Sequence, residues 1–325
     1  MALLQTLTTP APISSLVCIG HLFAGSDDGS LRVYDLLSWK ATRAIRGLPA
    51  EISSVVSGQS GDVWLAAGRS AYAFSMSITK LVQTIADATM VLELGADEDD
   101  VLNELALNPS KTHLAFSTDS GSVGVVDIAT KSVSRMKTQH TSICGLVRFI
   151  PDRPREIVSG GYDSALLHFD YMLGSTLSRR DFTADPATQG VSLSPPFIMS
   201  AALSTTGAMA AGTADGRLWL GTGGDKGALA AKSTKKKRSR KWEGLNADDE
   251  ILEKAAEGPL VAMAFAGSST LVVSTLLGNI MHYTASRNDA DELQLSKTAE
   301  FQSGVSKVNA LVHFDEKNRD SRALC

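Results

Sequence analysis

The sequence has few cysteines, no long apolar run and no strong excess of charge of one sign. Its three cysteines, Cys18, Cys144 and Cys325, lie far apart in the chain, and no C-x-x-C pair is present. This pattern supports neither a zinc site nor a disulfide framework, so we expect no metal or other cofactor and a reducing compartment. A run of about 18 apolar residues, which a membrane-spanning helix needs, is also absent, so we expect no membrane contact.

The N-terminal segment lacks the features of a signal peptide. MALLQTLTTPAPISS has no charged n-region, and Pro10 and Pro12 interrupt it, so we interpret it as part of the mature structure. The whole chain carries 31 Lys and Arg against 35 Asp and Glu, a net charge of −4. Any contact with nucleic acid would therefore depend on a local basic segment.

The chain contains many glycine-containing turns and many short segments in which apolar and polar residues alternate. With 325 residues, of which 43% are hydrophobic, it can form a sizeable core. Period-2 segments recur, each after a turn signal, at 30–36, 122–128, 165–171, 217–223 and 279–285. Strands that follow tight turns in this way predict antiparallel sheets.

Each of these units also has β-prone segments before its turn, and several have one after the aspartate that ends the segment. Four strands per unit at a spacing of about 40–45 residues are typical of the blades of a β-propeller. A weaker unit at 62–76 fills the longest interval, with a shortened turn around Arg69. A generic β-sandwich is the alternative interpretation.

The residues of these units resemble the WD40 family. The match consists of Asp-Gly or Asp-Ser in the tight turn, followed by an aromatic–Asp pair such as Tyr34-Asp35 or Phe169-Asp170. The Trp of the family motif is missing from every unit. The resemblance implies an all-β fold, a WD40-type β-propeller that covers residues 1–325 as a single domain.

Six clear blades can be counted from Ile13 to Arg287, and a seventh, incomplete blade begins at 306–314. The resemblance implies that an N-terminal strand, LLQTLTT at 3–9, supplies the outer strand of this blade and closes the ring. The second and third strands of the blade have no convincing sequence. We therefore expect that the chain is truncated or that its last blade is irregular.

His140, Ser159 and Asp163 are residues of the types that form an acyl-transfer triad. Nothing near Ser159 resembles a nucleophile elbow or an oxyanion hole, which leaves a hydrolase as the least favoured hypothesis. In WD40 blades, a loop His, a strand Ser and a turn Asp form a structural hydrogen-bond network, so the resemblance implies that role here. Asp28 and Asp215 occupy the same turn position in other units. His168 is expected to pack or to lie at the surface.

A basic, flexible insertion is expected at about 224–257. Its segment KSTKKKRSRK, at 232–241, has seven Lys or Arg in ten residues, so like charges repel and the loop should be exposed. Three interpretations of this segment compete: an import signal bound by a carrier, a contact to RNA phosphates, or a solvated loop. The cations of these hypotheses are Lys235, Lys236, Lys237, Arg238, Arg240 and Lys241. Trp242 is expected to anchor the end of the loop, where KWEGL resumes the fourth strand.

An acidic run, 97–100, is interpreted as a solvated loop between blades or as a contact for a basic partner. Residues just before the turn aspartates, or in the shortened turn, point towards the face where partners are expected to dock. They are Tyr162, Asp27, Ala214 and Arg69, and Tyr162 is the first choice because aromatic anchors dominate interface energetics.

The sequence predicts a non-enzymatic protein-interaction scaffold, a subunit or adaptor of a nuclear complex. GGYDSALLHFDY and KKKRSRKWEGL resemble the WD repeat-containing protein 53 group. Some members of the wider family are substrate receptors of a cullin-RING ubiquitin ligase and carry Arg two residues after the third-strand Asp. Leu37, Ala129 and Met172 stand there in this chain. That role and a ribosome-assembly or RNA-associated role are the alternatives, with nuclear or nucleolar localisation expected and a cytoplasmic one as the alternative.

Overall fold

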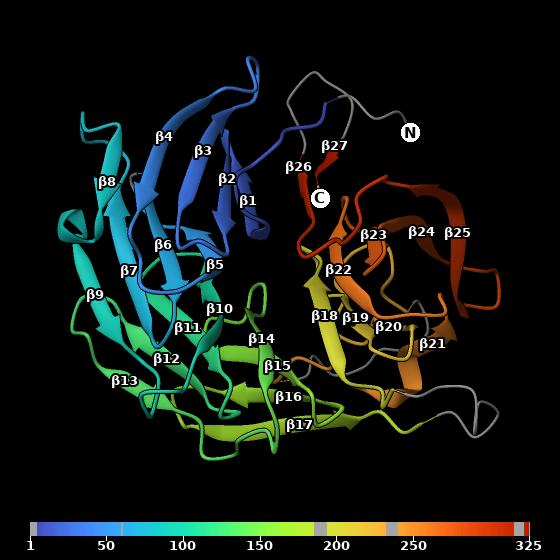
Figure 1. Cartoon of the computed structure of the whole chain (residues 1–325). Helices are drawn as coiled ribbons and strands as arrows, with labels where there is room; N and C mark the ends of the chain where they lie inside the picture. The colour runs from blue at the N-terminus through green and yellow to red at the C-terminus, as the bar shows by residue number, and fades with distance from the viewer. Residues whose placement is uncertain (1–4, 60, 185–193, 232–239, 315–321, 325) are drawn as a thin grey trace.

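The computed structural model describes residues 5–59, 61–184, 194–231, 240–314 and 322–324. They form six consecutive sheets, here called blades 1 to 6 in chain order, and a two-stranded sheet near the C-terminus (Figure 1). The prediction of an all-β propeller with six clear blades is confirmed.

Blades 1 to 3 contain β1 (Ile13–Ile19), β2 (His21–Ser26), β3 (Leu31–Asp35) and β4 (Ala41–Arg46); β5 (Ile52–Ser57), β6 (Asp62–Ala67), β7 (Ser70–Ser75) and β9 (Met90–Glu93); and β10 (Leu102–Leu107), β11 (His113–Thr118), β12 (Val123–Asp127) and β13 (Val133–Arg135). Blades 4 to 6 contain β14 (Cys144–Phe149), β15 (Glu156–Gly161), β16 (Ala165–Asp170) and β17 (Ser175–Asp181); β18 (Ile198–Leu203), β19 (Met209–Thr213), β20 (Arg217–Gly221) and β21 (Glu250–Lys254); and β22 (Leu260–Phe265), β23 (Thr270–Thr275), β24 (Asn279–Arg287) and β25 (Leu293–Gln302).

Each blade buries both faces because it lies between two neighbours. In β16, Leu167 and Phe169 pack with residues of blade 3 such as Val125, whereas Leu166 packs with Ile198 of blade 5. Successive side chains of a strand point to opposite faces. The central strands are therefore apolar on both faces, and the clear alternation noted in the sequence survives mainly in the outer strands.

The first strand of every blade carries the same irregularity in register, which shows that the six units share one geometry. The shift lies at Ile13/Ser15, Ile52/Ser54, Leu102/Glu104, Cys144/Leu146, Ile198/Ser200 and Leu260/Ala262. Beside it, polar side chains tie several blades to the next: Ser53 Oγ donates to the Leu102 carbonyl (2.6 Å), Asn103 Nδ2 to that of Cys144 (3.1 Å) and Ser200 Oγ to that of Leu260 (2.6 Å).

Among the residues that the structure describes, the seventh position holds two strands, β26 (Val312–Phe314) and β27 (Arg322–Leu324). β26 contacts both β22 and β1, so it lies between blade 6 and blade 1 (Figure 1). Asn309 Nδ2 donates to the Ile13 carbonyl at 2.8 Å and repeats the tie seen between other blades. The last blade is therefore present as an inner pair of strands, and the sheets do not close the ring.

The expected N-terminal closing strand is not found in residues 5–12, which form no strand, while 1–4 lie outside the described residues. Prolines at positions 10 and 12 lack the N–H that a sheet ladder needs, and the Thr9 hydroxyl donates to the Ala11 carbonyl at 2.8 Å within a local bend. Leu7 nevertheless packs against the cluster of Leu22 and Tyr34 on blade 1. The segment thus covers this blade with side chains and not with hydrogen bonds to a sheet.

Blade 1 has a fifth strand that the sequence does not predict. The connection between β7 and β9 reaches back, and its β8 (Val82–Thr84) pairs in parallel with β4. A single 3₁₀ turn, η1 (Ile85–Asp87), follows, and Asp87 accepts a hydrogen bond from the Thr84 N–H at 2.7 Å. This short, capped strand covers the edge of blade 1, which would otherwise offer free backbone groups to other chains.

Candidate functional site

The structure brings together His140, Ser159 and Asp163 in blade 4. His140 lies in the connection before β14, Ser159 in β15, and Asp163 in the tight turn before β16. His140 Nδ1 lies 2.8 Å from Asp163 Oδ1, and its Nε2 lies 2.8 Å from Ser159 Oγ. The Thr141 N–H donates to Asp163 Oδ2 at 3.1 Å. One imidazole therefore links a loop, a turn and a strand.

These groups are buried, which removes the access that a nucleophile needs. Ser159 is 0% exposed and His140 is 3% exposed. Cys144 lies beside them, and burial raises the pKa of its thiol to about 12, so it stays protonated at neutral pH. Buried polar groups of this kind satisfy one another, and we propose that the three residues stabilise the blade.

The carboxylate of this group is ionised in the folded protein. Burial disfavours the charge of Asp163, but the hydrogen bonds from His140 and from the Thr141 N–H outweigh it and hold the pKa below its ordinary value. A charged acceptor makes stronger hydrogen bonds than a neutral one. The turn is therefore held most firmly when the carboxylate carries its charge.

The corresponding turn positions of blades 1 and 5 use other partners. Asp28 is exposed and accepts the Ser30 N–H at 3.1 Å. Asp215 is buried and pairs with Arg217 Nε at 2.8 Å, while Arg217 Nη2 donates to the Thr183 carbonyl at 2.8 Å in the loop after β17. In blade 5, an arginine thus links loop and turn in the way that the histidine does in blade 4.

The acidic run before blade 3 is not wholly a solvated loop. Residues 97–99 are exposed, but Asp100 is buried, and it accepts the N–H groups of Ser120 and Ala96, each at 2.8 Å. Here the loop supplies the acid and the turn supplies the donors, the reverse of blade 4. The expectation of a solvated loop is wrong for Asp100 because buried backbone N–H groups require an acceptor.

The predicted partner face carries one half-buried aromatic pair. The Tyr162 ring stacks on Phe197, with centroids 5.6 Å apart and an angle of 14° between the rings. Asp27 is exposed, whereas Arg69 is paired with Glu93. Ala214 is buried and offers little surface to a partner. Of the four residues, Tyr162 and Asp27 are the ones whose side chains a partner can reach without breaking an ion pair.

The insertion in blade 5 occupies residues 222–249, because β20 ends at Gly221 and β21 begins at Glu250. The described ends of the insertion pack against neighbouring blades. The connection runs through η3 (Ala247–Asp249), and the Leu229 carbonyl and the Asp249 carboxylate both bind Arg287. The fourth strand, expected at KWEGL (241–245), begins only at Glu250, and Trp242 packs there as a buried side chain.

Trp242 is 2% exposed and is the expected anchor of the insertion. Its indole N–H donates to the Gly207 carbonyl at 2.8 Å, and its backbone N–H donates to Glu156 at 2.8 Å. A Cβ at Gly224 or at Gly244 would overlap the indole, so these two positions require glycine. The ring is thus enclosed by the two ends of the insertion and by blades 4 and 5.

A second buried histidine contacts this anchor, and sequence reasoning did not predict its partners. His168 is 0% exposed; its Nε2 lies 2.9 Å from Glu156 Oε2 and its Nδ1 2.9 Å from Ser178 Oγ. Trp242 meets the imidazole edge to face at 5.3 Å between centroids. Burial opposes the charge of Glu156, but hydrogen bonds from His168 and from the Trp242 N–H hold its pKa below the ordinary value. Glu156 and Trp242 are too far apart in sequence for any local pattern to pair them.

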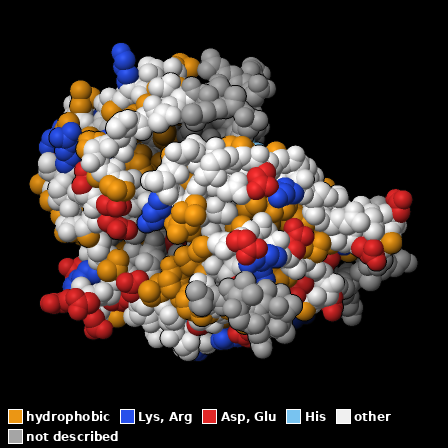
Figure 2. All heavy atoms as spheres, turned by 45° about the vertical axis from the view of Figure 1, so that its right-hand side comes forward, with side chains coloured by type: hydrophobic (Ala, Val, Ile, Leu, Met, Phe, Trp, Pro, Cys, Tyr) orange, Lys and Arg blue, Asp and Glu red, His pale blue; other side chains and the backbone are white. Residues whose placement is uncertain are grey.

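The cations of the insertion are only partly described. Lys235, Lys236, Lys237 and Arg238 lie outside the described residues. Arg240 is exposed, and its carbonyl accepts a hydrogen bond from Arg153 at 3.0 Å, while Lys241 Nζ donates to the Leu177 carbonyl at 3.0 Å. On the face seen in Figure 2, acidic and basic side chains are interspersed and hydrophobic ones form small groups.

The described residues contain no group of three or more His, Cys, Asp or Glu placed to hold a metal ion. Within the same residues, no helix is long and apolar enough to cross a membrane.

Comparison with known proteins supports the fold. No protein-family model matches the chain. Among curated proteins, it is similar to the WD repeat-containing protein 53 homolog of Dictyostelium discoideum, with 22% identity over 197 residues, which cover 54% of this chain and 52% of that protein. The chain thus spans about half the length of this relative. The described residues thus form consecutive antiparallel sheets arranged as in a WD40 β-propeller, and the chain is similar in sequence to a WD repeat-containing protein 53 homolog.

Proposed function

We propose that this propeller is a non-enzymatic scaffold that binds other proteins as a subunit or adaptor of a nuclear complex. The observation that carries the proposal is the burial of Ser159, His140 and Asp163. The groups that could have formed a catalytic triad are hydrogen-bonded to one another inside the blade. Fold alone does not determine function, so the proposal rests on this site and on the similarity to a WD repeat protein.

The partner site is proposed on the face that carries the tight turns, centred on the Tyr162–Phe197 stack. Asp27 extends this site as an exposed acid. Burial and the nearby Asp119 raise the pKa of Tyr162, so its hydroxyl stays protonated and can donate a hydrogen bond at neutral pH. An aromatic ring with a polar end, half in and half out of the surface, is the kind of residue that anchors interfaces.

The basic segment 232–241 supports the nuclear part of the proposal. Its residues Arg240 and Lys241 leave the docked end of the insertion beside blade 4. We propose that an import carrier binds the segment and that a contact to RNA phosphates is its second use. The cullin-ligase alternative has no support of this kind: Leu37 and Met172 are 72% and 62% exposed where those receptors carry Arg.

Affinity purification of the tagged chain, with Tyr162→Ala beside wild type, tests the proposed face. We expect Tyr162→Ala to reduce recovery of the main partners about 10-fold or more, as for an interface hot spot, and to lower stability by only about 1 kcal/mol through the lost stacking. Tyr162→Phe is the matched control and should retain most binding. Unchanged partner recovery with Tyr162→Ala would move the site elsewhere.

The same purification with residues 232–241 deleted separates the roles of the insertion. Loss of nuclear localisation with unchanged partners supports the import signal. Loss of RNA alone supports the phosphate contact. Recovery of a cullin-ligase adaptor by the wild-type chain would support the ligase alternative and contradict the proposal.

A further inference from the structure

The first strand of blade 4 lacks a side chain at a position where its neighbours use one to bind the next blade. Ser53 of blade 2 and Asn103 of blade 3 stand at the register shift of their strands, and they donate to carbonyls of the next first strand at 2.6 and 3.1 Å. Gly145 stands at the shift in blade 4, and no described side chain donates to the matching carbonyl, that of Ile198. Blade 4 thus has an unfilled side-chain position, here called the Gly145 position, at the tight-turn end of its first strand.

The Gly145 position lies beside the stacked rings of Tyr162 and Phe197. A Cβ added to Gly145 would have one neighbour within 4 Å, the Tyr162 Cε1 at 3.5 Å, so the space above this residue is otherwise open. Gly145, Tyr162 and Phe197 are each partly exposed, and the Tyr162 hydroxyl has no hydrogen-bond partner among the described residues. A side chain from a bound protein can therefore enter this space and pack on an aromatic ring.

A carboxylate lies next to the Gly145 position. Asp119, in the tight turn of blade 3, accepts a hydrogen bond at Oδ1 from Asn103 Nδ2 at 3.0 Å. The same Nδ2 donates at 3.1 Å to the carbonyl of Cys144, the residue before Gly145. Burial and then the charge of Asp119 raise the pKa of Tyr162, so the carboxylate also acts on this ring. Asp119 is exposed, and its Oδ2 has no partner among the residues that the structure describes, so this oxygen is available to a bound cation.

This part of the face carries more free acids than free cations. The acids at 97–99 are exposed and lie in the loop before β10, which is hydrogen-bonded to the tight turn of Asp119. None of these four carboxylates has an ion-pair partner among the described residues. The neighbouring cations that already have a partner are Arg69, Arg135 and Arg179. Lys137 is exposed, but its backbone is bonded to the outer hairpin of blade 4. The charge next to the Gly145 position is therefore negative.

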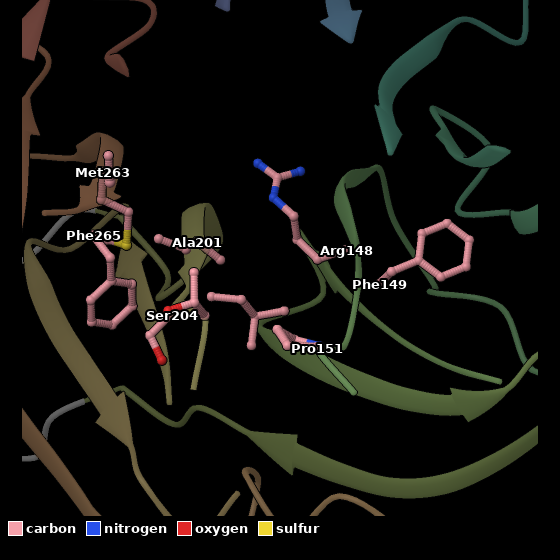
Figure 3. A pocket seen from close by; sticks show the side chains of 11 residues that line it. Arg148, Phe149, Pro151, Ala201, Ser204, Met263 and Phe265 are labelled. Carbon is pink, nitrogen blue, oxygen red and sulfur yellow. The ribbon is translucent and has the colours of Figure 1, made fainter. Parts of the chain in front are cut away.

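The opposite ends of the first strands have no such unmatched charge. A cavity of about 340 Å³ lies there between blades 4, 5 and 6. Figure 3 shows Arg148 and Pro151 on one side of it and Met263 and Phe265 on the other, with the Arg148 side chain extended into the open space. Arg148 is paired with Glu104, so its charge is already matched. The apolar walls of this cavity favour no particular partner, whereas the Gly145 position combines an aromatic ring with free carboxylates.

Within the partner face of the proposed function, on which this inference rests, we propose that the Gly145 position binds an arginine side chain of a partner protein. The guanidinium packs on the Tyr162 ring and donates to the free oxygen of Asp119. Further Lys or Arg residues of the same segment meet the acids at 97–99, so the charges of segment and face are complementary. Arginine fits better than lysine because its planar guanidinium stacks on aromatic rings and offers two parallel N–H groups to a carboxylate.

Selection from a phage-displayed library of random dodecapeptides tests this inference. We expect the wild-type chain to enrich peptides that share one arginine and carry further Lys or Arg residues around it. Fluorescence anisotropy of a labelled selected peptide then measures affinity. Replacing the shared arginine of the peptide by alanine should weaken binding about 10-fold or more, as for an interface hot spot. Replacement by lysine should also weaken it, because an ammonium group lacks the planar fork of donors.

Gly145→Asn is the decisive variant, because it fills the position with the side chain that blade 3 uses there. The backbone of Gly145 is not at a positive φ, and a Cβ would make an ordinary contact with Tyr162, so the variant should fold. We expect the affinity for the selected peptide to fall about 10-fold while the temperature of thermal unfolding is unchanged or higher. A position with a purely structural role would change stability and leave the affinity as it is.

Asp119→Asn removes the proposed counter-charge and should also weaken binding about 10-fold, since a charge-assisted hydrogen bond becomes a neutral one. It stays decisive if Gly145→Asn does not fold. Glu51→Gln is the matched control, because Glu51 is likewise an exposed acid of this face but lies in the loop before blade 2. It should leave the affinity within about 2-fold.

Enrichment of no arginine-containing peptide, or unchanged affinity in either folded variant, overturns the inference. If Tyr162→Ala still reduces partner recovery in that case, the proposed face stands without the arginine; if it does not, the proposed function fails as well. A synthetic peptide of residues 232–241 is measured beside the selected ones. Tighter binding of this peptide than of any selected one would make a second copy of the chain the occupant and would contradict the proposal of another protein.

Discussion

Replacing Trp242 by alanine is expected to lower the free energy of unfolding by about 3–5 kcal/mol, the range for removing a large buried aromatic side chain. The substitution empties the space between Gly224 and Gly244 and removes the indole N–H bond to the Gly207 carbonyl. It also takes away the ring that packs on His168. Urea-induced unfolding monitored by circular dichroism measures the change.

The effect of Trp242→Ala should extend to the ends of the insertion. Amide hydrogen exchange is expected to rise in 222–231 and 240–249, while the first three blades keep their protection. Trp242→Phe is the control: it keeps most of the packing and should cost about 1–2 kcal/mol for the lost N–H bond and the smaller ring. A Trp242→Ala protein as stable as wild type would contradict the docking of the insertion on blades 4 and 5.

Replacing His140 by alanine is expected to cost about 3 kcal/mol, because it leaves a buried carboxylate and a buried hydroxyl without their shared partner. Asp163 retains only the Thr141 N–H, and Ser159 Oγ loses its bond at 2.8 Å. Asp28→Ala is the matched control, since Asp28 holds the same turn position but is exposed, and it should cost about 1 kcal/mol or less. Equal effects of the two substitutions would contradict the structural role of the network.

The same network predicts a dependence on pH. The pKa of Asp163 is lowered in the folded protein from its ordinary value of 3.8. Its contribution to stability is therefore complete above pH 3.8 and is lost as the pH falls towards the folded-state pKa. In His140→Ala this acid-dependent part of the stability should shrink, because the main hydrogen-bond donor that lowers the pKa is gone.

The repeat was predictable because its signals are local. Three of the tight turns place a glycine, Gly29, Gly121 or Gly216, at a positive φ between +70° and +83°, a conformation that glycine adopts easily. The regular spacing of these turns along the chain then predicts a four-stranded blade for each repeat. The resemblance of this unit to a known repeat predicts that His140, Ser159 and Asp163 contact one another.

The contacts that sequence reasoning missed all join segments that have no fixed spacing. Trp242 reaches Glu156 across most of blade 5, and β8 returns to blade 1 from the far side of blade 2. Arg217 replaces a histidine by bonding to Thr183 in another blade. Such pairings depend on how the blades pack against each other, so secondary-structure propensity and hydrophobic periodicity along the chain do not predict them.

We propose that the His140–Ser159–Asp163 group stabilises a blade of a binding scaffold and takes no part in catalysis. Ser159→Ala, measured for both stability and hydrolysis of ester and amide substrates, tests it most directly. We expect a loss of about 1–3 kcal/mol in the free energy of unfolding, because His140 Nε2 is left unpaired in the interior. Hydrolysis should be at background in both proteins. A wild-type activity that Ser159→Ala abolishes at unchanged stability would contradict the claim.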